Sequence, residues 1–396
     1  MTPEHRFVDV GGLRIHYLHD GDKGAPLVLL HEGGSDSASL SWGHLISPLA
    51  TSYCVFAPDW PGYGESDRPD AEYSMPYYIS VLGRFIDSTR LVRPSLVGIS
   101  MGGAVALGFT LSHPEAVKKL VLVDSYGLQD RAPAHKLSYL FVRAPLVNEL
   151  TWASLARSRS MARASLQGLF HNPGSLTEEL FDAVFAELNK PRAGAAFRSF
   201  QRNELRWDGT NTVYMDQLDK VRAPTLIVHG ADDSLVPLRF ARQAHALLPG
   251  SQLRVISNAG HWVQREQPQE FLEAITAFLK EQTLCSPTTR WSTHSLEPSA
   301  GSPEPPPLPP SGSRVTGGRP SAAPFDRAAP PRTLAGACRR PRAGSVPGPR
   351  VKIVTRGASE SPVEWGRVSR VRPGSRGASQ RRAEHPAIGG SVYTRY

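Results

Sequence analysis

The chain has 396 residues, of which 40% are hydrophobic, and it carries a formal net charge of +9. The charge is uneven, because residues 284–396 contain 18 basic and 6 acidic side chains, which leaves 27 basic and 30 acidic ones in residues 1–283. The positive total is therefore no sign that the amino-terminal part binds nucleic acid. Three cysteines argue against a disulfide framework, and Cys54, in an apolar run, is expected to be a small buried side chain.

The amino terminus, MTPEHRFVDV, lacks the apolar core of a secretory signal. No apolar run approaches the ~18–20 residues of a membrane span. We therefore expect a cytoplasmic protein that acts on a small-molecule substrate and not at a membrane. The sequence leaves the oligomeric state open.

Strand-like and helix-like patterns alternate over the first 124 residues. The first two strands are expected to form a hairpin around Gly11 and Gly12. The later strands are continuous apolar runs, typical of strands covered on both faces. This alternation predicts an α/β fold with a mostly parallel sheet. The expected strands are 6–10, 13–20, 26–30, 53–59, 94–99 and 120–124, and the expected helices are 42–49, 77–91 and 101–112.

Helical patterns without a convincing strand follow residue 124. The candidate helices are 137–150, 154–170 and 176–190, with Ser175 or Thr177 as the N-cap of the last. The sheet pattern then returns, with strands at 224–230 and 251–257 and helices at 238–248 and 267–281. These patterns predict a core made of residues 1–124 and 221–283, and a helical cap, or lid, made of residues 125–220.

Residues 284–396 are rich in Pro, Gly, Ser, Ala and Arg. Such a composition buries too little apolar surface to offset the entropy of ordering, so we expect a disordered tail. Proline-rich segments can dock protein partners, and Arg/Gly-rich tails can bind nucleic acid. We expect no role of the tail in catalysis and no nucleic-acid partner for the core.

The stretch LVGISMGG, residues 96–103, carries the first catalytic signal. Gly98, Ser100 and Gly102 stand in G-x-S-x-G spacing between an expected strand and an expected helix, which is the pattern of a nucleophile elbow. The turn strains the backbone at Ser100 and brings positions 98 and 102 together, so a Cβ at either would clash. The pattern predicts Ser100 as the nucleophile; the alternative is a Ser/Gly-rich turn without chemistry.

A serine hydroxyl needs a base, and the base needs a third group to orient it. His261, in NAGHW after an expected strand, is the candidate base, and the alternative is an ordinary surface histidine. Asp233 is the candidate acid that would fix the imidazole tautomer. Its neighbour Asp232, and Asp124 at the end of another strand, are the alternatives.

Gly33 and Gly34 directly follow a buried strand. Glycines in this place let backbone N–H groups point into a site, as the stabilisation of an oxyanion requires. An ordinary glycine turn is the alternative. No metal or organic cofactor is expected, because neither Cys/His ligand spacing nor a phosphate-binding loop is present.

Residues 6–282 resemble the α/β-hydrolase fold family. The resemblance rests on HEGG, DWPGYGESD, GISMGG, GADDSLVP and NAGHWVQREQPQEF, and on the chain order Ser100, Asp233, His261. It implies an eight-stranded, mostly parallel sheet flanked by helices, with residues 125–220 as a lid. It also implies an oxyanion hole made by the N–H groups of Gly33 and Met101. Gly34 and Trp262 are then expected to contact substrate.

The chain departs from the family at Glu32, where members usually have glycine. The second oxyanion N–H is therefore left open among Glu32, Gly33 and Gly34. A carboxylate at this position is also expected to disfavour anionic substrates.

Within the family, Ser-Met-Gly-Gly, and Gly-His-Trp followed by Gln264 and Glu266, resemble the meta-cleavage-product hydrolases, which cut a carbon–carbon bond in ring-fission products of aromatic compounds. That group usually has Asn where this chain has Ile99. It also uses an arginine of the cap to bind the substrate carboxylate. Arg198, Arg202 and Arg206 are the candidates for that arginine here, and their spacing does not choose among them. We therefore predict hydrolysis of a carboxylic ester through an acyl-enzyme, with carbon–carbon hydrolysis as the alternative.

Other classes are less well supported. Dehalogenases and epoxide hydrolases of this fold have aspartate at the position of Ser100. Two rivals come from other classes. One is a catalytically inactive protein that only binds a small ligand, and the other is a nucleic-acid- or partner-binding protein that acts through its arginine-rich tail. Apolar side chains in the expected cap suggest an apolar acyl or aryl group; they are Leu140, Phe141, Leu146, Trp152 and Phe170.

Overall fold

A computed structural model of the chain describes residues 2–144 and 146–281. The tail predicted at 284–396 lies outside these residues. Among the helices of the described part, none is both long and apolar enough to cross a lipid bilayer.

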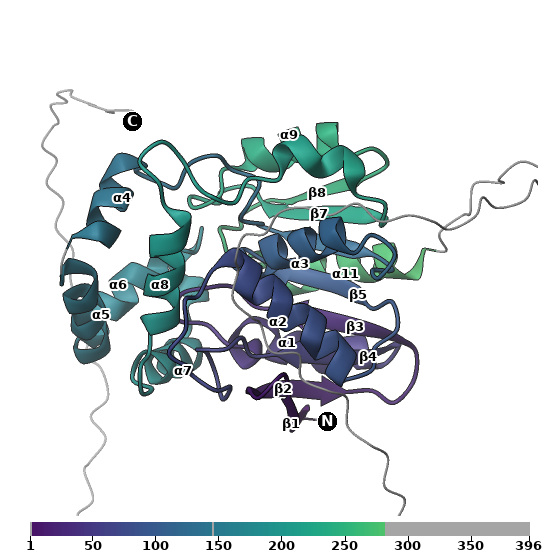
Figure 1. The fold of residues 1–396 in the computed structure, drawn as a ribbon, viewed down its shortest axis with the longest axis horizontal. Coiled ribbons are helices and arrows are strands. Elements are labelled where there is room, and N and C mark those ends of the chain that lie inside the picture. The colour runs from purple at the N-terminus through teal and green to yellow at the C-terminus, as the bar shows by residue number, and fades with distance from the viewer. Residues whose placement is uncertain (1, 145, 282–396) are drawn as a thin grey trace, which may run out of the picture. The chain divides into compact units, whose positions relative to one another are not determined.

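An eight-stranded sheet forms the centre of the fold, in the order β1-β2-β4-β3-β5-β6-β7-β8 (Figure 1). The pairs β1–β2 and β2–β4 are antiparallel, and all other neighbours are parallel. The predicted hairpin and the mostly parallel sheet are thus confirmed. The strands are β1 (Glu4–Asp9), β2 (Arg14–Asp20), β3 (Ala25–Leu30), β4 (Tyr53–Pro58), β5 (Ser95–Ile99), β6 (Leu120–Val123), β7 (Thr225–Gly230) and β8 (Gln252–Ile256).

Helices cover both faces of the sheet, which explains the continuous apolar runs. Along β3, Val28 and Leu30 pack in one core cluster with α2, α3 and α9, whereas Leu27 and Leu29 pack in a second cluster with α1 and α11. Successive residues of a strand point to opposite faces, so both sets must be apolar. The helices that lie along the two faces of the sheet are α1 (Ala38–Ala50), α2 (Met75–Ser88), α3 (Met101–Ser112), α9 (Leu238–Leu247), α10 (Val263–Glu266) and α11 (Pro268–Lys280).

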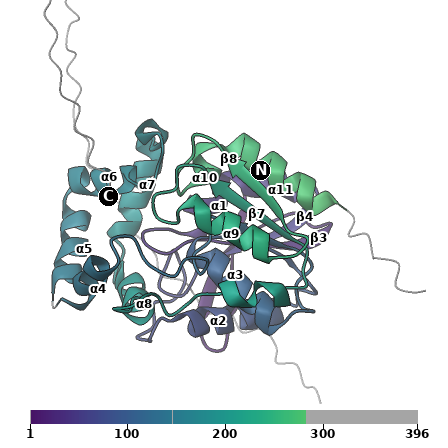
Figure 2. The ribbon, with the colours of Figure 1, turned by 90° about the horizontal axis from the view of Figure 1, so that it is seen from above.

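The chain between β6 and β7, residues 125–220, forms a helical insertion. Its helices gather at one end of the sheet (Figures 1 and 2). They are α4 (Lys136–Arg143), α5 (Val147–Arg157), α6 (Arg159–Gln167), α7 (Glu178–Leu188) and α8 (Ala195–Glu204), with short 3₁₀ turns η1 (Pro173–Ser175) and η2 (Met215–Lys220).

The insertion differs from the prediction in its helix boundaries. The expected helix 137–150 is two helices, because Ala144 precedes a proline and is extended, with ψ 125°. The expected helix 154–170 is interrupted at Ser158, whose side chain caps α6 by accepting a hydrogen bond from the Met161 N–H. Thr177 caps α7. Helix α8 has no counterpart in the sequence prediction.

Candidate active site

Ser100 lies on the turn between β5 and α3. Its backbone has φ 49° and ψ −117°, a conformation that costs a non-glycine residue energy and that the surrounding structure must hold in place. A Cβ on Gly98 would lie 2.4 Å from the Gly102 carbonyl oxygen, and one on Gly102 would lie 2.4 Å from the Leu30 carbonyl oxygen. Both glycines are therefore required by close backbone approaches, as the sequence predicted.

His261 is buried in the loop after β8. Its backbone N–H donates to the Leu169 carbonyl at 2.8 Å, and its Nδ1 lies 2.8 Å from Asp233 Oδ2. The other oxygen of Asp233 accepts hydrogen bonds from the N–H groups of Leu235, at 2.7 Å, and Val236, at 3.0 Å. These bonds hold the carboxylate in the orientation that an acid of a catalytic triad needs.

The neighbouring Asp232 points elsewhere. Its Oδ2 lies 3.0 Å from Nδ1 of His171, and both side chains are about half exposed. The structure therefore brings Asp233, and not Asp232, to the imidazole of His261.

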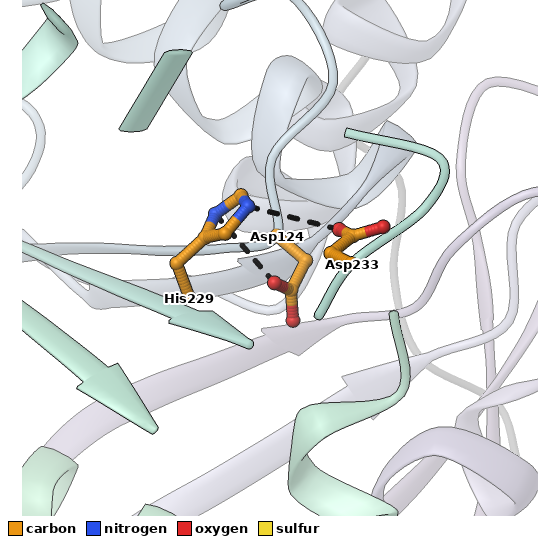
Figure 3. A group of neighbouring side chains, drawn as sticks. All are labelled: Asp124, His229 and Asp233. Atoms are coloured by element: carbon orange, nitrogen blue, oxygen red, sulfur yellow. Dashed lines mark ion pairs between the residues drawn. The ribbon is translucent and has the colours of Figure 1, made fainter. Parts of the chain in front are cut away.

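Asp124, the third candidate acid, lies close to His229 and Asp233, and the imidazole of His229 is within ion-pair distance of each of the two carboxyl groups (Figure 3). His229 Nδ1 is 3.5 Å from Asp124 Oδ1, and His229 Nε2 is 3.8 Å from Asp233 Oδ2. His229 Nε2 also donates to the Val236 carbonyl at 2.7 Å, while Asp124 Oδ1 accepts from the Gly230 N–H at 2.8 Å. Ligand atoms of these three side chains lie within 4.8 Å of one another, but Asp233 and His229 already have protein partners, so we assign no cation here.

Burial and the charges of the neighbours set the protonation states of this group. Burial opposes the charged form of His261, but Asp233 and Glu32 together raise its pKa well above the usual value. Burial alone would raise the pKa of Asp233, yet the charge and hydrogen bond of His261 hold it below its usual value. Burial and the Asp233 carboxylate raise the pKa of Asp124 well above its usual value. The arrangement favours one buried ion pair, His261–Asp233, beside a neutral Asp124.

The loop after β3 is fixed by His31. Its Nδ1 donates to the Glu32 carbonyl at 2.8 Å, and its Nε2 accepts the Trp60 N–H at 3.0 Å. The indole N–H of Trp60 in turn donates to the His31 carbonyl at 2.9 Å. Burial lowers the pKa of His31 to about 4, so a neutral imidazole serves as a structural brace for this loop.

The same loop narrows the choice of oxyanion donors. The N–H of Glu32 donates to Asp36 Oδ2 at 3.0 Å and is therefore engaged. The backbone N–H groups of Gly33 and Gly34 therefore remain as the candidates for the second oxyanion donor. Met101 is the first residue of α3, where amides have no intrahelical partner. The oxyanion role of Gly33 and Met101 stays a prediction.

The side chain of Glu32 reaches the imidazole of His261. Its Oε2 lies 3.3 Å from His261 Nε2, and only 7% of the residue is exposed. The sequence indicated a carboxylate near the pocket but gave no sign of this contact, because it joins loops 229 residues apart.

A pocket of about 430 Å³ contains Ser100 and His261 in its wall. The helical insertion supplies apolar lining. The predicted oxyanion-hole residues Gly33 and Met101 and the predicted substrate-contact residues Gly34 and Trp262 also line it. Further lining comes from Trp152, Leu155, Leu166, Leu169, Phe197 and Phe200.

Of the five apolar cap residues singled out in the sequence, only Trp152 lines this pocket. Leu140, Phe141 and Leu146 are exposed, Leu146 to 68%, and Phe170 packs edge-on against Trp262. These four side chains therefore do not line the pocket, and the apolar acyl or aryl group that they suggested stays a prediction. Phe197 and Phe200, on the unpredicted helix α8, line the pocket instead. The available signal was their i, i+3 spacing, together with the i, i+4 spacing of Ala196 and Phe200.

The pocket wall contains two carboxyl side chains and no basic residue other than His261 within residues 2–144 and 146–281. Glu32 and Glu204 are among its lining residues, whereas Arg and Lys are absent from the lining that residues 2–144 and 146–281 provide. The three candidate arginines are engaged elsewhere: Arg198 with the Ala193 carbonyl, Arg202 with Glu149, and Arg206 with Asp208.

Comparison with known proteins identifies the family. Residues 26–268 match the family model described as the alpha/beta hydrolase fold. The chain belongs to this family, and it is a hydrolase with an eight-stranded, mostly parallel sheet flanked by helices.

Several characterised proteins are similar to this chain. The 2-hydroxy-6-oxo-6-(2'-aminophenyl)hexa-2,4-dienoic acid hydrolase of Metapseudomonas resinovorans is 33% identical over 290 residues, which cover 70% of this chain and 91% of that protein. The structure of CarC, a serine hydrolase involved in carbazole degradation, is 28% identical, covers 70% of this chain and 98% of that chain, and has a TM-score of 0.59. A membrane phospholipase A, a bacterial virulence factor, is 26% identical, covers 70% of this chain and 86% of its own, and has a TM-score of 0.57.

Proposed function

We propose that this hydrolase cleaves a small-molecule carboxylic ester through an acyl-enzyme on Ser100, with His261 as the base and Asp233 as its orienting acid. One observation carries the proposal: the 2.8 Å pair of His261 and Asp233 stands in the wall of the same apolar pocket as Ser100, which a strained turn presents there.

The steps follow from ordinary acyl-transfer chemistry. Ser100 Oγ attacks the ester carbonyl carbon as His261 Nε2 takes its proton. The oxyanion is held by the N–H groups of Met101 and Gly33. His261 gives the proton to the departing alcohol, then removes one from a water that attacks the acyl-enzyme. The acid leaves, and Ser100 regains its proton.

Carbon–carbon hydrolysis is the second candidate, favoured by the similarity to the dienoic acid hydrolase of Metapseudomonas resinovorans. The same serine and histidine would serve it, because the bond that breaks is also next to a carbonyl. Its substrates carry a carboxylate. The pocket offers Glu32 and Glu204 where such a substrate needs a cation, which is why we place the ester first.

The test is a hydrolysis panel on the full-length chain. It compares p-nitrophenyl esters of increasing acyl length with a 2-hydroxy-6-oxo-dienoate, and it adds labelling by a fluorophosphonate. We expect turnover of the esters and labelling, both lost in Ser100→Ala and both kept in Ser112→Ala, at the far end of the same helix. A higher kcat/KM for the dienoate than for every ester would select the second candidate. Full turnover in Ser100→Ala would exclude Ser100 as the nucleophile.

A further inference from the structure

The carboxylate of Glu32 lies beside the imidazole nitrogen of His261 that the proposed catalysis requires. Asp233 holds Nδ1, so Nε2 is the nitrogen left to take the proton of Ser100, and Glu32 Oε2 lies 3.3 Å from it. Within the described residues, that oxygen is buried and makes no hydrogen bond that meets standard geometry. A buried carboxylate oxygen needs a donor, and the Nε2–H of a protonated His261 is the donor at hand.

The backbone on both sides of this side chain is fixed. The N–H of Glu32 donates to Asp36 Oδ2, and its carbonyl accepts from His31 Nδ1. The same oxygen of Asp36 accepts the hydroxyl of Ser41 at 2.5 Å. Burial and the neighbouring carboxyl group of Glu32 raise the pKa of Asp36 well above its usual value. The fixed loop therefore aims the carboxyl group of Glu32 at the imidazole of His261.

We propose that Glu32 is a specificity-determining and positioning residue: its carboxylate holds Nε2 of His261 in the resting enzyme, and it selects uncharged esters over esters that bear a carboxylate. This inference rests on the proposed function.

Charge repulsion is the reason for the selection. A substrate carbonyl that reaches Ser100 brings its acyl chain into the pocket that Glu32 and Glu204 line, and no Arg or Lys from residues 2–144 or 146–281 lines it. An anionic group on the acyl chain meets these carboxyl groups inside the pocket, where like charges are screened less than in bulk water. We expect discrimination of ~10–100-fold against such a substrate.

Competition for Nε2 is the reason for the positioning effect. Ser100 can give its proton only to a neutral imidazole, and a nearby carboxylate favours the imidazolium. Activity should therefore rise with pH as His261 loses its proton. Removing the charge of Glu32 should move the midpoint of this rise to lower pH.

Other titratable groups also face this pair, and they stay in place when Glu32 is changed. They are Asp233 and Asp124 from the ends of β7 and β6, His229 on β7, Asp36 on the same loop with Arg265 of α10 beside it, Tyr63 after β4, and Glu204 of α8 across the pocket.

The experiment uses a matched pair of substrates, p-nitrophenyl butyrate and mono-p-nitrophenyl succinate, which differ by a terminal carboxylate. The values of kcat/KM are measured as a function of pH for the full-length protein, Glu32→Gln and Glu32→Gly. We expect the preference of the unchanged protein for butyrate to fall ~10-fold or more in both variants. We also expect the pH midpoint for butyrate to move to lower pH. Glu204→Gln, which removes a pocket carboxylate that does not contact His261, is the charge control and should move the midpoint less.

The inference is overturned if both Glu32 variants keep the substrate preference and the pH midpoint, or if Glu204→Gln moves the midpoint as far. Thermal unfolding shows whether either variant is folded, and the glycine variant restores the residue usual in the family. Where ester turnover is slow, the pH dependence of fluorophosphonate labelling gives the same midpoint. Ser100→Ala separates the two proposals. If this variant retains turnover, the proposed function is refuted. If it loses turnover while the Glu32 variants keep the substrate preference and pH midpoint of the unchanged protein, only the role of Glu32 is refuted.

Discussion

Glu266 Oε2 accepts a hydrogen bond from the backbone N–H of Gly260 at 2.5 Å, directly beside His261. The same carboxylate accepts the N–H groups of His171, at 3.0 Å, and Asn172, at 2.9 Å, from the helical insertion. The side chain of Glu266 thus connects the loop of the candidate base, through hydrogen bonds, to the helical insertion that lines the pocket.

Replacing Glu266 should therefore lower both the stability of the fold and the rate of ester hydrolysis. In Glu266→Gln the charge is lost and one acceptor oxygen must serve three donors, so we expect a loss of ~1–3 kcal/mol in the free energy of unfolding. The kcat for ester hydrolysis should fall as the histidine loop loosens. Denaturant unfolding and steady-state kinetics measure the two effects. Glu273→Gln, exposed on α11, is the control, and an equal loss there would show that the contacts of Glu266 are not the cause.

The two buried aspartates should differ in their effect on the reaction. Asp233→Asn leaves His261 without the acceptor that fixes its tautomer, so we expect kcat/KM to fall by ~10⁴. Asp124→Asn replaces a carboxyl that the structure keeps neutral with a neutral amide of the same shape, and should cost far less. A larger loss in Asp124→Asn than in Asp233→Asn would make Asp124 the acid of the triad.

Asp124 should also make stability depend on pH. Its native pKa is raised by burial and by Asp233, so the folded chain keeps a proton that the unfolded chain releases above about pH 4. The contribution is thus fully present at low pH and is lost as pH rises towards the native pKa, by at most about 1.4 kcal/mol per pH unit.

Asp124→Asn has no such proton to lose. We therefore expect the free energy of unfolding of this variant, relative to that of the unchanged protein, to increase as the pH rises from about 5 to about 8. Denaturant titrations at constant salt measure this difference. A difference between the two proteins that stays constant over this range would mean that Asp124 is ionised in the fold.

The glycines of the nucleophile turn should not tolerate a methyl group. In Gly98→Ala the new Cβ meets the Gly102 carbonyl oxygen at 2.4 Å, so we expect ~1–3 kcal/mol of destabilisation and loss of fluorophosphonate labelling. Gly43→Ala is the counterpart within α1, where the nearest atom, Ser39 Oγ, is 3.6 Å away. It should stabilise the protein by ~0.5–1 kcal/mol, since alanine is the better helix former. Thermal unfolding of both variants checks the opposite signs.

Lys119 should act on stability alone. It is buried, and its Nζ donates to the carbonyl groups of Phe278 at 2.6 Å and Glu281 at 2.5 Å, at the end of α11. Lys119→Met leaves these carbonyls without their charged donor, and we expect a loss of ~1.5–3 kcal/mol in the free energy of unfolding, with kcat unchanged. The exposed neighbour Lys118, changed to Met, should have little effect. A large drop in kcat for Lys119→Met at a temperature where it is folded would contradict this prediction.

The parts of the fold that the sequence predicted well are those with strong periodic patterns. Strands such as β3 and helix α3 are apolar on nearly every residue because they are covered on all sides, and their ends agree with the prediction to within a residue. In the helical insertion the pattern is weaker, since α4 and α5 expose apolar side chains such as Leu137 and Leu150. Their boundaries depend on single caps, such as Ser158, which a pattern of apolar residues does not reveal.

The candidate site divides in the same way. Ser100, His261 and Asp233 stand in short local motifs after strand ends, and a parallel sheet brings the ends of its strands to one edge. The lining by Phe197 and Phe200, and the contact between Glu32 and His261, depend on how distant segments pack. No local pattern contains that information.

The helical insertion leaves the sheet after β6 and re-enters it at β7, and these two strands are hydrogen-bonded neighbours. The entry and exit points therefore lie side by side, so residues 125–220 can lengthen, shorten or be exchanged without altering the register of any strand pair. Evolution can remodel the roof of the pocket while Ser100, Asp233 and His261 keep their places on the sheet edge beneath it. The pocket lining that the insertion supplies and the three candidate catalytic side chains thus lie on parts of the chain that can change separately.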